Sequence, residues 1–254
     1  VAIGNIYRIQ GEYQLALDHY QQAINIHKTI GDKKNEGINL GNIGNVYQHQ
    51  GEYQLALDHY QQALNIAKQI GNKKGLGINL GNIGDILIQC NEYQEANQVL
   101  QQAISICDAT IPPAAGAYRG SLALLLAKEG NFEGALALLE KGESQVKVYP
   151  QEYGKFLCKK AKILHLVNQP QQAFEALQKA QKIAKKLKVN ENSELAITIE
   201  AIKQQISEVT TTLSQVVSIE ETHTYPREYT PEQEEAILEG DRFIELGRVC
   251  WRNN

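Results

Sequence analysis

Apolar residues in this chain recur at intervals of three and four positions, which is the spacing of one face of an α-helix. A β-strand would instead alternate apolar and polar residues. The members of one such series are Leu40, Ile43, Tyr47, Ala56, Tyr60, Ala63 and Ile66. Gly51 interrupts this series, which predicts a turn between two helices and hence a helical hairpin.

The hairpin pattern is repeated along the chain. Residues 11–40 and 51–80 are identical at 24 of 30 positions, at an offset of 40. A weaker copy follows at 91–107, and the spacing alone indicates two more at 130–142 and 168–180. One hairpin cannot bury its own apolar stripe, whereas stacked hairpins can. We therefore predict five stacked hairpins over about 1–30, 34–70, 74–108, 114–147 and 151–188.

Conserved spacing within the copies points to a known family. Gly44 is followed by Tyr47, Ala56, Tyr60 and Ala63, and an equivalent series begins at Gly4. This series resembles the tetratricopeptide repeat, over about residues 1–188. The unit of about 40 residues is longer than the usual 34. It resembles the longer-helix subgroup of kinesin light chains and of bacterial, especially cyanobacterial, signalling arrays. The resemblance implies an all-α fold, a right-handed α-solenoid of stacked helical hairpins with a C-terminal capping helix.

The remainder of the chain predicts two further helices. Apolar residues from Leu195 to Leu213 keep the helical spacing, so residues 191–217 are expected to form the capping helix. Residues 218–230 are interpreted as a linker. Thr230 and Pro231 form a helix start, which predicts a final helix over 231–250. The chain begins at Val1 and contains no Met, so we expect it to be a piece of a longer protein.

Composition and motifs argue against catalysis and against several kinds of ligand. The chain has 25 basic and 29 acidic side chains, a balance that does not indicate a general nucleic-acid or membrane binder. No apolar run approaches the 18 residues of a membrane span. No Cys-x-x-Cys pair, histidine pair with ligand spacing or phosphate-binding glycine loop occurs. We predict no catalytic residue, no metal and no cofactor, and a non-enzymatic, cytoplasmic protein.

In the tetratricopeptide family the first helix of each hairpin lines a concave groove. Counting from the signature glycine, the resemblance places Asn5, Asn42, Asn45, Asn82 and Asp85 there. Because Asn is a mediocre helix former, its recurrence inside helices needs a reason. One hypothesis is a ladder of amides that hydrogen-bonds to the backbone of an extended peptide. The other is hydrogen bonding between helices within the stack.

Three glycines at one repeat position raise the same two possibilities. Gly41, Gly81 and Gly120 occupy one repeat position, three residues before the signature residue and on the same face. A glycine inside a helix costs about 0.5–1 kcal/mol relative to alanine. Its repetition indicates either the close approach of a ligand backbone or close packing between helices.

The fifth unit is basic. Lys155, Lys159, Lys162 and His165 fall at its groove positions. Residues 155–190 hold nine Lys and one acidic residue, whereas residues 191–245 hold 13 acidic and three basic residues. The lysines could bind carboxylates of a partner, or they could form a solvated face. The acidic helix expected at 231–250 could dock on the lysines and cover the groove, or it could pack elsewhere as a second cap.

These patterns predict a protein–protein interaction scaffold that holds a peptide segment of a partner in the concave groove. The partner is expected to be a protein or peptide, and acidic residues in it would suit the lysines. Nucleic acid is not expected, because no aromatic residues are interleaved with the lysines. The alternative is a regulatory or sensor segment of a larger signalling enzyme whose catalytic domain lies outside this chain.

Overall fold

The computed structural model of the chain describes residues 2–191 and 193–205. The described residues fold into paired α-helices, as the all-α repeat solenoid prediction requires, and that prediction is confirmed. The helices are α1 (Ala2–Ile9), α2 (Tyr13–Thr29), α3 (Lys33–Gln50), α4 (Tyr53–Gln69), α5 (Lys73–Gln89), α6 (Tyr93–Thr110), α7 (Pro112–Lys128), α8 (Phe132–Val146), α9 (Pro150–Leu166) and α10 (Pro170–Lys186). A further helix covers residues 194–205.

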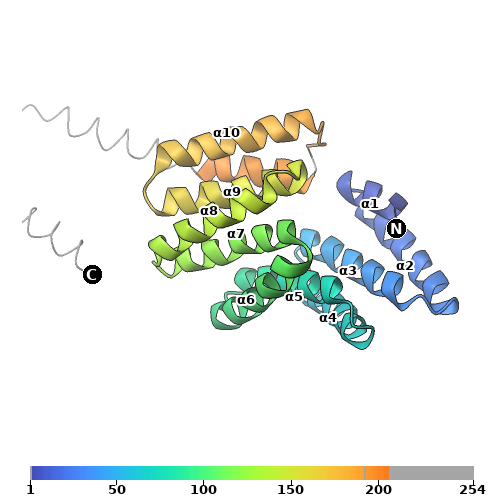
Figure 1. Cartoon of the computed structure of the whole chain (residues 1–254). Coiled ribbons are helices and arrows are strands. Elements are labelled where there is room, and N and C mark those ends of the chain that lie inside the picture. Colours follow the sequence, from blue (N-terminus) through green and yellow to red (C-terminus); the bar gives the residue numbers. More distant parts are fainter. Residues whose placement is uncertain (1, 192, 206–254) are drawn as a thin grey trace, which may run out of the picture. The chain divides into compact units, whose positions relative to one another are not determined.

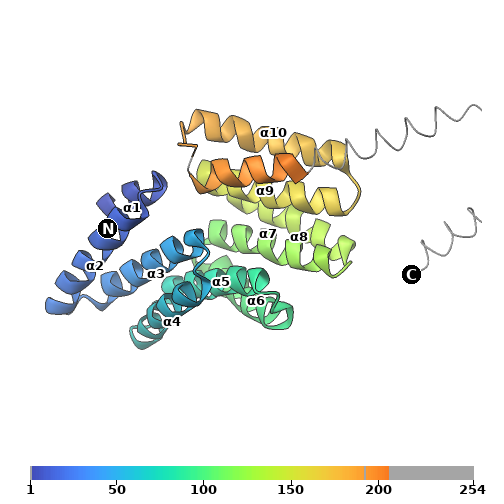
Figure 2. The ribbon, with the colours of Figure 1, turned by 180° about the vertical axis from the view of Figure 1, so that it is seen from behind.

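The pairs α1–α2, α3–α4, α5–α6, α7–α8 and α9–α10 stack in chain order (Figures 1 and 2). Each second helix packs against the first helix of the following pair: α2 against α3, α4 against α5, α6 against α7 and α8 against α9. The first helices also contact one another, α3 with α5, α5 with α7, and α7 with α9. The first helices therefore form one layer of the stack, and the second helices pack against that layer.

Short, well-defined turns separate the helices. Gly51 has φ +79°, a left-handed conformation that ends α3 and that glycine adopts without strain. The side chains of Asp32, Asn72 and Asn131 cap the following helices by accepting a hydrogen bond from a backbone N–H three residues later. Local sequence therefore sets where each helix starts and stops.

The signature residues pack on one another inside each hairpin. Tyr60 is fully buried, and a Cβ atom added to Gly44 would lie 2.6 Å from the Tyr60 ring. In the third hairpin the same contact is made by Gly84 and Leu100, also at 2.6 Å. The small residue of the first helix thus makes room for the large residue of the second, which explains their fixed separation in the sequence.

The other repeated glycines contact side chains of neighbouring helices. A Cβ atom at Gly81 would lie 2.1 Å from the ring of Tyr118, and one at Gly120 would lie 2.9 Å from Phe156. At Gly41 the nearest atom would be a side-chain oxygen at 3.2 Å. Close packing between helices therefore accounts for Gly81 and Gly120.

The helix at 194–205 covers the end of the stack. Its Leu195, Ile199 and Ile202 are buried in one cluster with residues of α9 and α10, such as Leu157 and Leu177. It is the described part of the capping helix predicted at 191–217. Residues 206–217, the linker predicted at 218–230 and the helix predicted at 231–250 lie outside the described residues, as does the expected docking of that last helix.

Overpacking between the hairpins is expected to destabilise the array. Ala56 is completely buried in a cluster with Tyr60 and Ile86. Replacing Ala56 by leucine should cost about 1–3 kcal/mol of unfolding free energy, because the added methylenes have no space. The adjacent Leu55 is 42% exposed, so Leu55→Ala is the matched control and should change stability little. Urea unfolding followed by circular dichroism measures both, and an unchanged midpoint for Ala56→Leu would contradict this packing.

Candidate functional site

Side chains of three first helices meet on one side of the stack, which we call the inner face. Lys159 of α9 donates a hydrogen bond to the hydroxyl of Ser121 on α7 at 2.5 Å. Its ammonium also lies 3.4 Å from a carboxylate oxygen of Asp85 on α5. Two residues predicted for the groove, Asp85 and Lys159, are thus brought together although 74 positions separate them.

A second group of ionisable side chains, the inner ion cluster, joins the two ends of the described stack. It consists of Arg8 of α1, His49 of α3, Lys155 of α9 and Glu194 at the start of the last helix. Glu194 forms an ion pair with Lys155, and its carboxylate lies 3.4 Å from Nε2 of His49. The same Nε2 is 3.4 Å from Nη1 of Arg8. Lys155, one of the predicted groove lysines, therefore has a carboxylate partner within the chain.

The charges of the inner ion cluster support one another. Burial raises the pKa of Glu194, but Lys155, His49 and Arg8 outweigh burial and hold that pKa below its ordinary value. Burial lowers the pKa of Lys155, yet the Glu194 carboxylate outweighs burial and raises it. Burial holds the pKa of His49 below its ordinary value. At neutral pH the cluster therefore contains an ionised carboxylate, two cations and a neutral imidazole.

The remaining groove candidates on α9 differ from Lys155 and Lys159. Lys162 is partly buried and forms no ion pair with any residue that the structure describes. Burial, together with the positive charges of Lys128 and Lys159, lowers the pKa of Lys162. His165 is half-buried in the last turn of α9, and its side chain makes no hydrogen bond or ion pair within 2–191 and 193–205. The structure does not bring it into the cluster.

The predicted amides are partly used by the stack itself. The buried hydroxyl of Tyr60 donates to Oδ1 of Asn45 at 2.7 Å, and Nδ2 of Asn82 donates to the same oxygen at 3.3 Å. The hydroxyl of Tyr118 in turn donates to Oδ1 of Asn82 at 3.1 Å. This chain of hydrogen bonds crosses three hairpins, so Asn45 and Asn82 contribute to hairpin stacking.

Asn5 and Asn42 differ in whether their side chains form hydrogen bonds within the stack. Asn5 accepts a hydrogen bond of 2.6 Å from the hydroxyl of Tyr20, in the same way that Asn45 accepts one from Tyr60. Asn42 makes no side-chain hydrogen bond with any described residue, and it is half-buried. Its amide is therefore the one among these candidates that the described stack leaves available.

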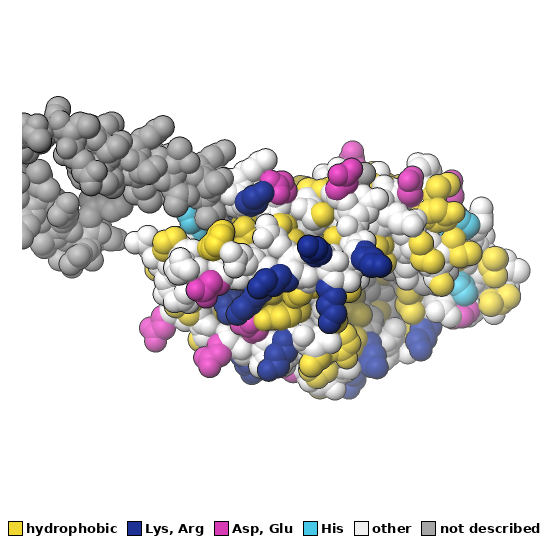
Figure 3. Space-filling view, turned by 90° about the horizontal axis from the view of Figure 1, so that it is seen from above, with side chains coloured by type: hydrophobic (Ala, Val, Ile, Leu, Met, Phe, Trp, Pro, Cys, Tyr) yellow, Lys and Arg dark blue, Asp and Glu magenta, His cyan; other side chains and the backbone are white. Residues whose placement is uncertain are grey.

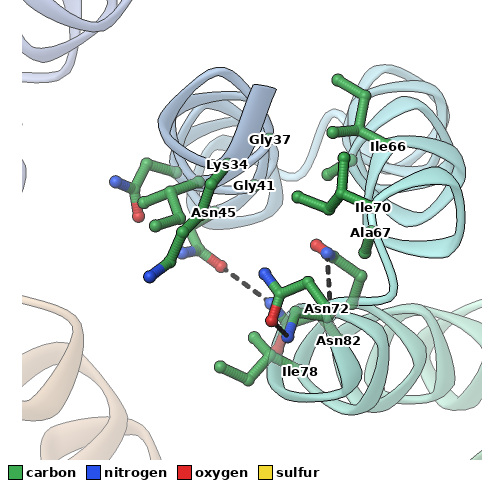
Figure 4. Close-up of a pocket in the computed structure, with 15 residues that line it drawn as sticks. Lys34, Gly37, Gly41, Asn45, Ile66, Ala67, Ile70, Asn72, Ile78 and Asn82 are labelled. Atoms are coloured by element: carbon green, nitrogen blue, oxygen red, sulfur yellow. Dashed lines mark hydrogen bonds between the residues drawn. The ribbon is translucent and has the colours of Figure 1, made fainter. Parts of the chain in front are cut away.

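A small cavity lies between α3, α4 and α5, and we call it the amide slot (Figure 4). Its volume is about 140 Å³. Figure 4 shows Ile66 and Ile70 projecting from α4 toward it, with Asn45 and Asn82 joined on the opposite side. Glycines at 37, 41 and 75 line it and leave the space free. Its other polar and apolar lining residues include Ile38, Asn42, Ile78 and Asn79.

The amide slot adjoins the inner face. On α3, Asn45 and His49 are four residues apart, and on α5, Asn82 and Asp85 are three apart. Residues at these spacings lie on the same side of a helix. Asn45 and Asn82 of the slot thus share sides of α3 and α5 with His49 and Asp85, and we treat the slot, the inner ion cluster and the Lys159–Asp85 pair together as the candidate functional site.

Comparisons with known proteins agree with the helix pairing. A family model described as tetratricopeptide repeat matches residues 1–69 and 35–109. Residues 1–109 of this chain are therefore tetratricopeptide repeats. Its fold is that of a protein-interaction scaffold. No curated protein matches the sequence.

Solved structures with a similar fold include three repeat proteins. The apo form of RapI has a TM-score of 0.56 at 16% identity, covering 80% of this chain and 82% of that one. BtubC from P. vanneervenii has a TM-score of 0.55 at 14% identity, covering 73% and 78%. A variant of a putative kinesin light chain of P. anserina, with nearly identical TPR-like repeats, has a TM-score of 0.51 at 19% identity, covering 74% and 93%. At these identities the likeness extends to the fold alone.

The lysines of residues 155–190 divide into two sets, apart from Lys160, which pairs with Glu143 of α8. Lys155, Lys159 and Lys162 lie on the inner face, whereas the lysines of α10 and its end are exposed. Figure 3 views the molecule from the side on which Figure 1 places α10, and basic side chains gather there. The exposed lysines in this part of the chain are Lys179, Lys182, Lys185, Lys186 and Lys188. A solvated basic face, the second interpretation of the lysine-rich sequence, therefore describes α10.

No group of three or more His, Cys, Asp or Glu side chains in 2–191 and 193–205 is arranged to hold a metal ion. Over the same residues, no helix combines the length and apolar character that crossing a lipid bilayer requires. Burial raises the pKa of the Cys107 and Cys158 thiols to about 11 and about 12, so both favour the unreactive thiol form.

Sequence reasoning missed Arg8, His49 and Glu194 as site residues. Arg8 and His49 are 41 positions apart, and no local pattern links them to a glutamate more than 140 positions later. The available signal was the change from basic to acidic sequence after residue 190, which places Glu194 among the first acidic residues beyond the lysines.

Proposed function

We propose that this tetratricopeptide array binds an extended peptide segment of a partner protein along its inner face. An apolar side chain of the peptide would enter the amide slot, the Asn42 amide would bind the peptide backbone, and acidic side chains would face the lysines of α9. This proposal keeps the groove residues predicted from the sequence and adds the slot.

The amide slot is the observation that carries the proposal. Its Ile38, Ile70 and Ile78 are 40%, 41% and 37% exposed, which is unusual for large apolar side chains beside a cavity. Binding sites for small groups are typically concave and mostly apolar, with a few polar groups that fix orientation. The slot has this composition, because its apolar wall is bordered by amides that can both donate and accept.

The backbone of a bound segment would find partners at the edge of the slot. An asparagine amide offers two N–H donors and one oxygen with two acceptor positions. Asn42 has all of these available within the described structure, and Asn82 donates one of its two hydrogens to Asn45. An extended peptide that presents alternating N–H and C=O groups matches this arrangement, whereas a helix has already used those groups internally.

Charge on the inner face supports an acidic segment. Lys162 has no carboxylate partner among the described residues, and burial together with the positive charges of two other lysines lowers its pKa. A nearby carboxylate would relieve that repulsion. The lysines of α9 therefore favour a peptide that carries acidic side chains beside its apolar anchor.

Replacing Asn42 by alanine tests the proposal. Peptides are first selected on the parent array from a random phage-displayed library, and their Kd is then measured by isothermal titration calorimetry. Asn42→Ala is expected to weaken binding about tenfold, since a hydrogen bond to a buried polar group contributes roughly 1–3 kcal/mol. The unfolding midpoint should stay at or above that of the parent, because alanine is the better helix former.

The matched control is Asn65→Ala on the exposed side of α4, where Asn65 accepts a hydrogen bond from Gln61. It should leave the Kd of every selected peptide unchanged. Equal affinities for the parent and Asn42→Ala would show that the peptides do not use the slot. A lower unfolding midpoint in Asn42→Ala would instead make this amide part of the stack.

Other expectations from the sequence stay predictions. They are the absence of enzymatic activity, the cytoplasmic location, the role in bacterial signalling and the absence of nucleic-acid binding. The alternative of a regulatory segment within a larger signalling enzyme also stays a prediction, and it is compatible with peptide binding by the inner face.

A further inference from the structure

Glu194 lies where a partner's carboxylate would be expected to bind. It belongs to the segment after α10, and it reaches Lys155 on α9 and His49 on α3. The side chains of Lys155 and His49 are 25% and 13% exposed, so these contacts lie well inside the surface. One carboxylate of the chain thus occupies part of the face that we propose for an acidic peptide.

The cations around Glu194 exceed its charge. Arg8 and Lys155 carry two positive charges against the single carboxylate of Glu194. Nη1 of Arg8 is placed at the imidazole of His49, and its Nε is buried without a hydrogen-bond partner. An arginine usually binds a carboxylate through two N–H groups. The Arg8 guanidinium therefore retains an N–H donor that no described residue accepts from.

The spacing of the lysines sets the kind of segment that would fit. Lys155 and Lys162 are seven residues apart on α9, which corresponds to about 10 Å along a helix. An extended peptide advances about 3.3 Å per residue, so about three residues span that distance. Lys159, between them, is already held by Ser121 and Asp85. A segment with two acidic residues about three positions apart would reach both ends of this row.

Displacement of Glu194 requires little rearrangement. The adjacent Leu195 is buried in the cluster of α9 and α10, and the Ser193 hydroxyl accepts a hydrogen bond from the backbone N–H of Ala196. These contacts anchor the start of the last helix independently of the Glu194 side chain. The Glu194 side chain is 35% exposed and can swing toward solvent while the helix stays in place.

We propose that Glu194 is a resident competitor for acidic partners. Its carboxylate holds Lys155 and His49 until a carboxylate of an acidic peptide takes the same position, with Arg8 and Lys162 contributing further contacts. This inference rests on the proposed function, because it names the chemistry of the partner and a regulator of the same face. The affinity of the array for an acidic segment is thereby set below the value that its cations alone would provide.

The test compares two fluorescein-labelled decapeptides of serine, one with Glu and one with Gln at every third position. Their Kd values are measured by fluorescence anisotropy at low ionic strength, where exposed charges are least screened. Glu194→Gln keeps the size of the side chain and removes its charge. If Glu194 occupies the cations about nine-tenths of the time, this variant should bind the Ser-Glu peptide about tenfold more tightly than the parent.

Two further variants make the comparison specific. Glu200→Gln, on the same helix, removes an exposed carboxylate paired with Lys203 and should leave the Kd unchanged. Lys155→Gln should weaken binding of the Ser-Glu peptide. The double variant Lys155→Gln/Glu194→Gln should lose most of the affinity that Glu194→Gln alone gains. Glu194→Asp provides a folded alternative if Glu194→Gln lowers the unfolding midpoint below the measuring temperature. Its shorter side chain should give a Kd between those of the parent and of Glu194→Gln.

The outcomes separate the competitor from the proposed function. Equal Kd values for the parent and Glu194→Gln, with the Ser-Gln peptide binding more weakly, would reject the competitor and leave acidic recognition intact. A gain in Glu200→Gln equal to that in Glu194→Gln would also reject it. Equal binding of the two peptides, or no binding of the Ser-Glu peptide to any variant, would reject acidic recognition and the competitor together.

Discussion

Replacing Gly81 by alanine is expected to destabilise the array by about 3 kcal/mol, at the upper end of the usual cost of overpacking. The new Cβ atom would lie 2.1 Å from Cζ of Tyr118 and 2.3 Å from two further ring atoms. Tyr118 is only 6% exposed, and its hydroxyl is held by the backbone oxygen of Ile78 and by Asn82. The ring cannot move away without giving up these hydrogen bonds and disturbing its buried neighbours.

The repeat supplies a matched control for this substitution. Gly41 occupies the same position one unit earlier, but a Cβ atom there would meet only the side-chain oxygen of Asn79, at 3.2 Å. Gly41→Ala should therefore be neutral or slightly stabilising, since alanine is better than glycine inside a helix by about 0.5–1 kcal/mol. Urea unfolding of both variants measures the difference. Similar midpoints for Gly41→Ala and Gly81→Ala would mean that Tyr118 does not pack on α5 as described.

Replacing Asp108 by asparagine should cost about 2 kcal/mol of unfolding free energy. Asp108 of α6 binds the buried Arg119 of α7 through both carboxylate oxygens, at 2.5 and 2.7 Å, and Gln145 of α8 hydrogen-bonds to both residues. Removing one partner of a buried ion pair typically costs 3–5 kcal/mol. A smaller cost is expected here, because the Asp108 side chain is 37% exposed. Asp58→Asn, at an exposed site on α4, is the control and should change stability little.

This pair also predicts how stability depends on pH. Hydrogen bonds from Arg119 lower the pKa of Asp108 to about 2, below the value of about 3.9 of an unfolded chain. The folded state therefore binds the Asp108 proton less tightly than the unfolded state does. The contribution of the pair is complete above about pH 4 and declines as the pH falls toward 2. The difference in unfolding free energy between the parent and Asp108→Asn should narrow over that range, and a constant difference would contradict the assignment.

The two largest expected effects fall at the junction of the third and fourth hairpins. Tyr118 and Arg119 are neighbours on α7, and they bind residues of α5 and of α6 and α8 respectively. Since peptide binding is proposed for the slot between α3, α4 and α5, the Tyr118–Asn82 hydrogen bond links this junction to the site. Variants at the junction should therefore be compared by stability first and by peptide affinity only where they remain folded.

The hairpins and their packing residues could be predicted from the sequence alone. The spacing of Gly44 and Tyr60 recurs in successive units, and the structure shows that the glycine makes room for the ring. Such a pattern is readable because each contact joins residues 16 positions apart within one hairpin. The repeat position likewise predicted that Asn42, Asn45 and Asn82 would share one side of the first helices, and all three line the amide slot.

Whether these amides are available to a ligand was decided by the tertiary structure. Asn45 and Asn82 both carry amides on this side of the first helices, yet one accepts from Tyr60 of its own hairpin and the other from Tyr118 of the next. Tyr118 does not belong to the repeated series, so its contact with Gly81 and Asn82 could not be read from spacing. The same holds for Asn42, whose amide has no partner among the described residues.

The lysines of the inner face show most clearly what the sequence determined and what the tertiary structure decided. The sequence by itself determined that Lys155, Lys159 and Lys162 lie along one side of a helix, because that follows from helical periodicity. Only the tertiary structure decided that Lys155 binds Glu194, that Lys159 binds Asp85 and Ser121, and that Lys162 binds no described carboxylate. These contacts join residues 38 to 74 positions apart, because the stacking of hairpins places α5 and α7 within reach of α9. Stacking sums small rotations over several interfaces, so no local pattern of residues encodes which side chains finally meet.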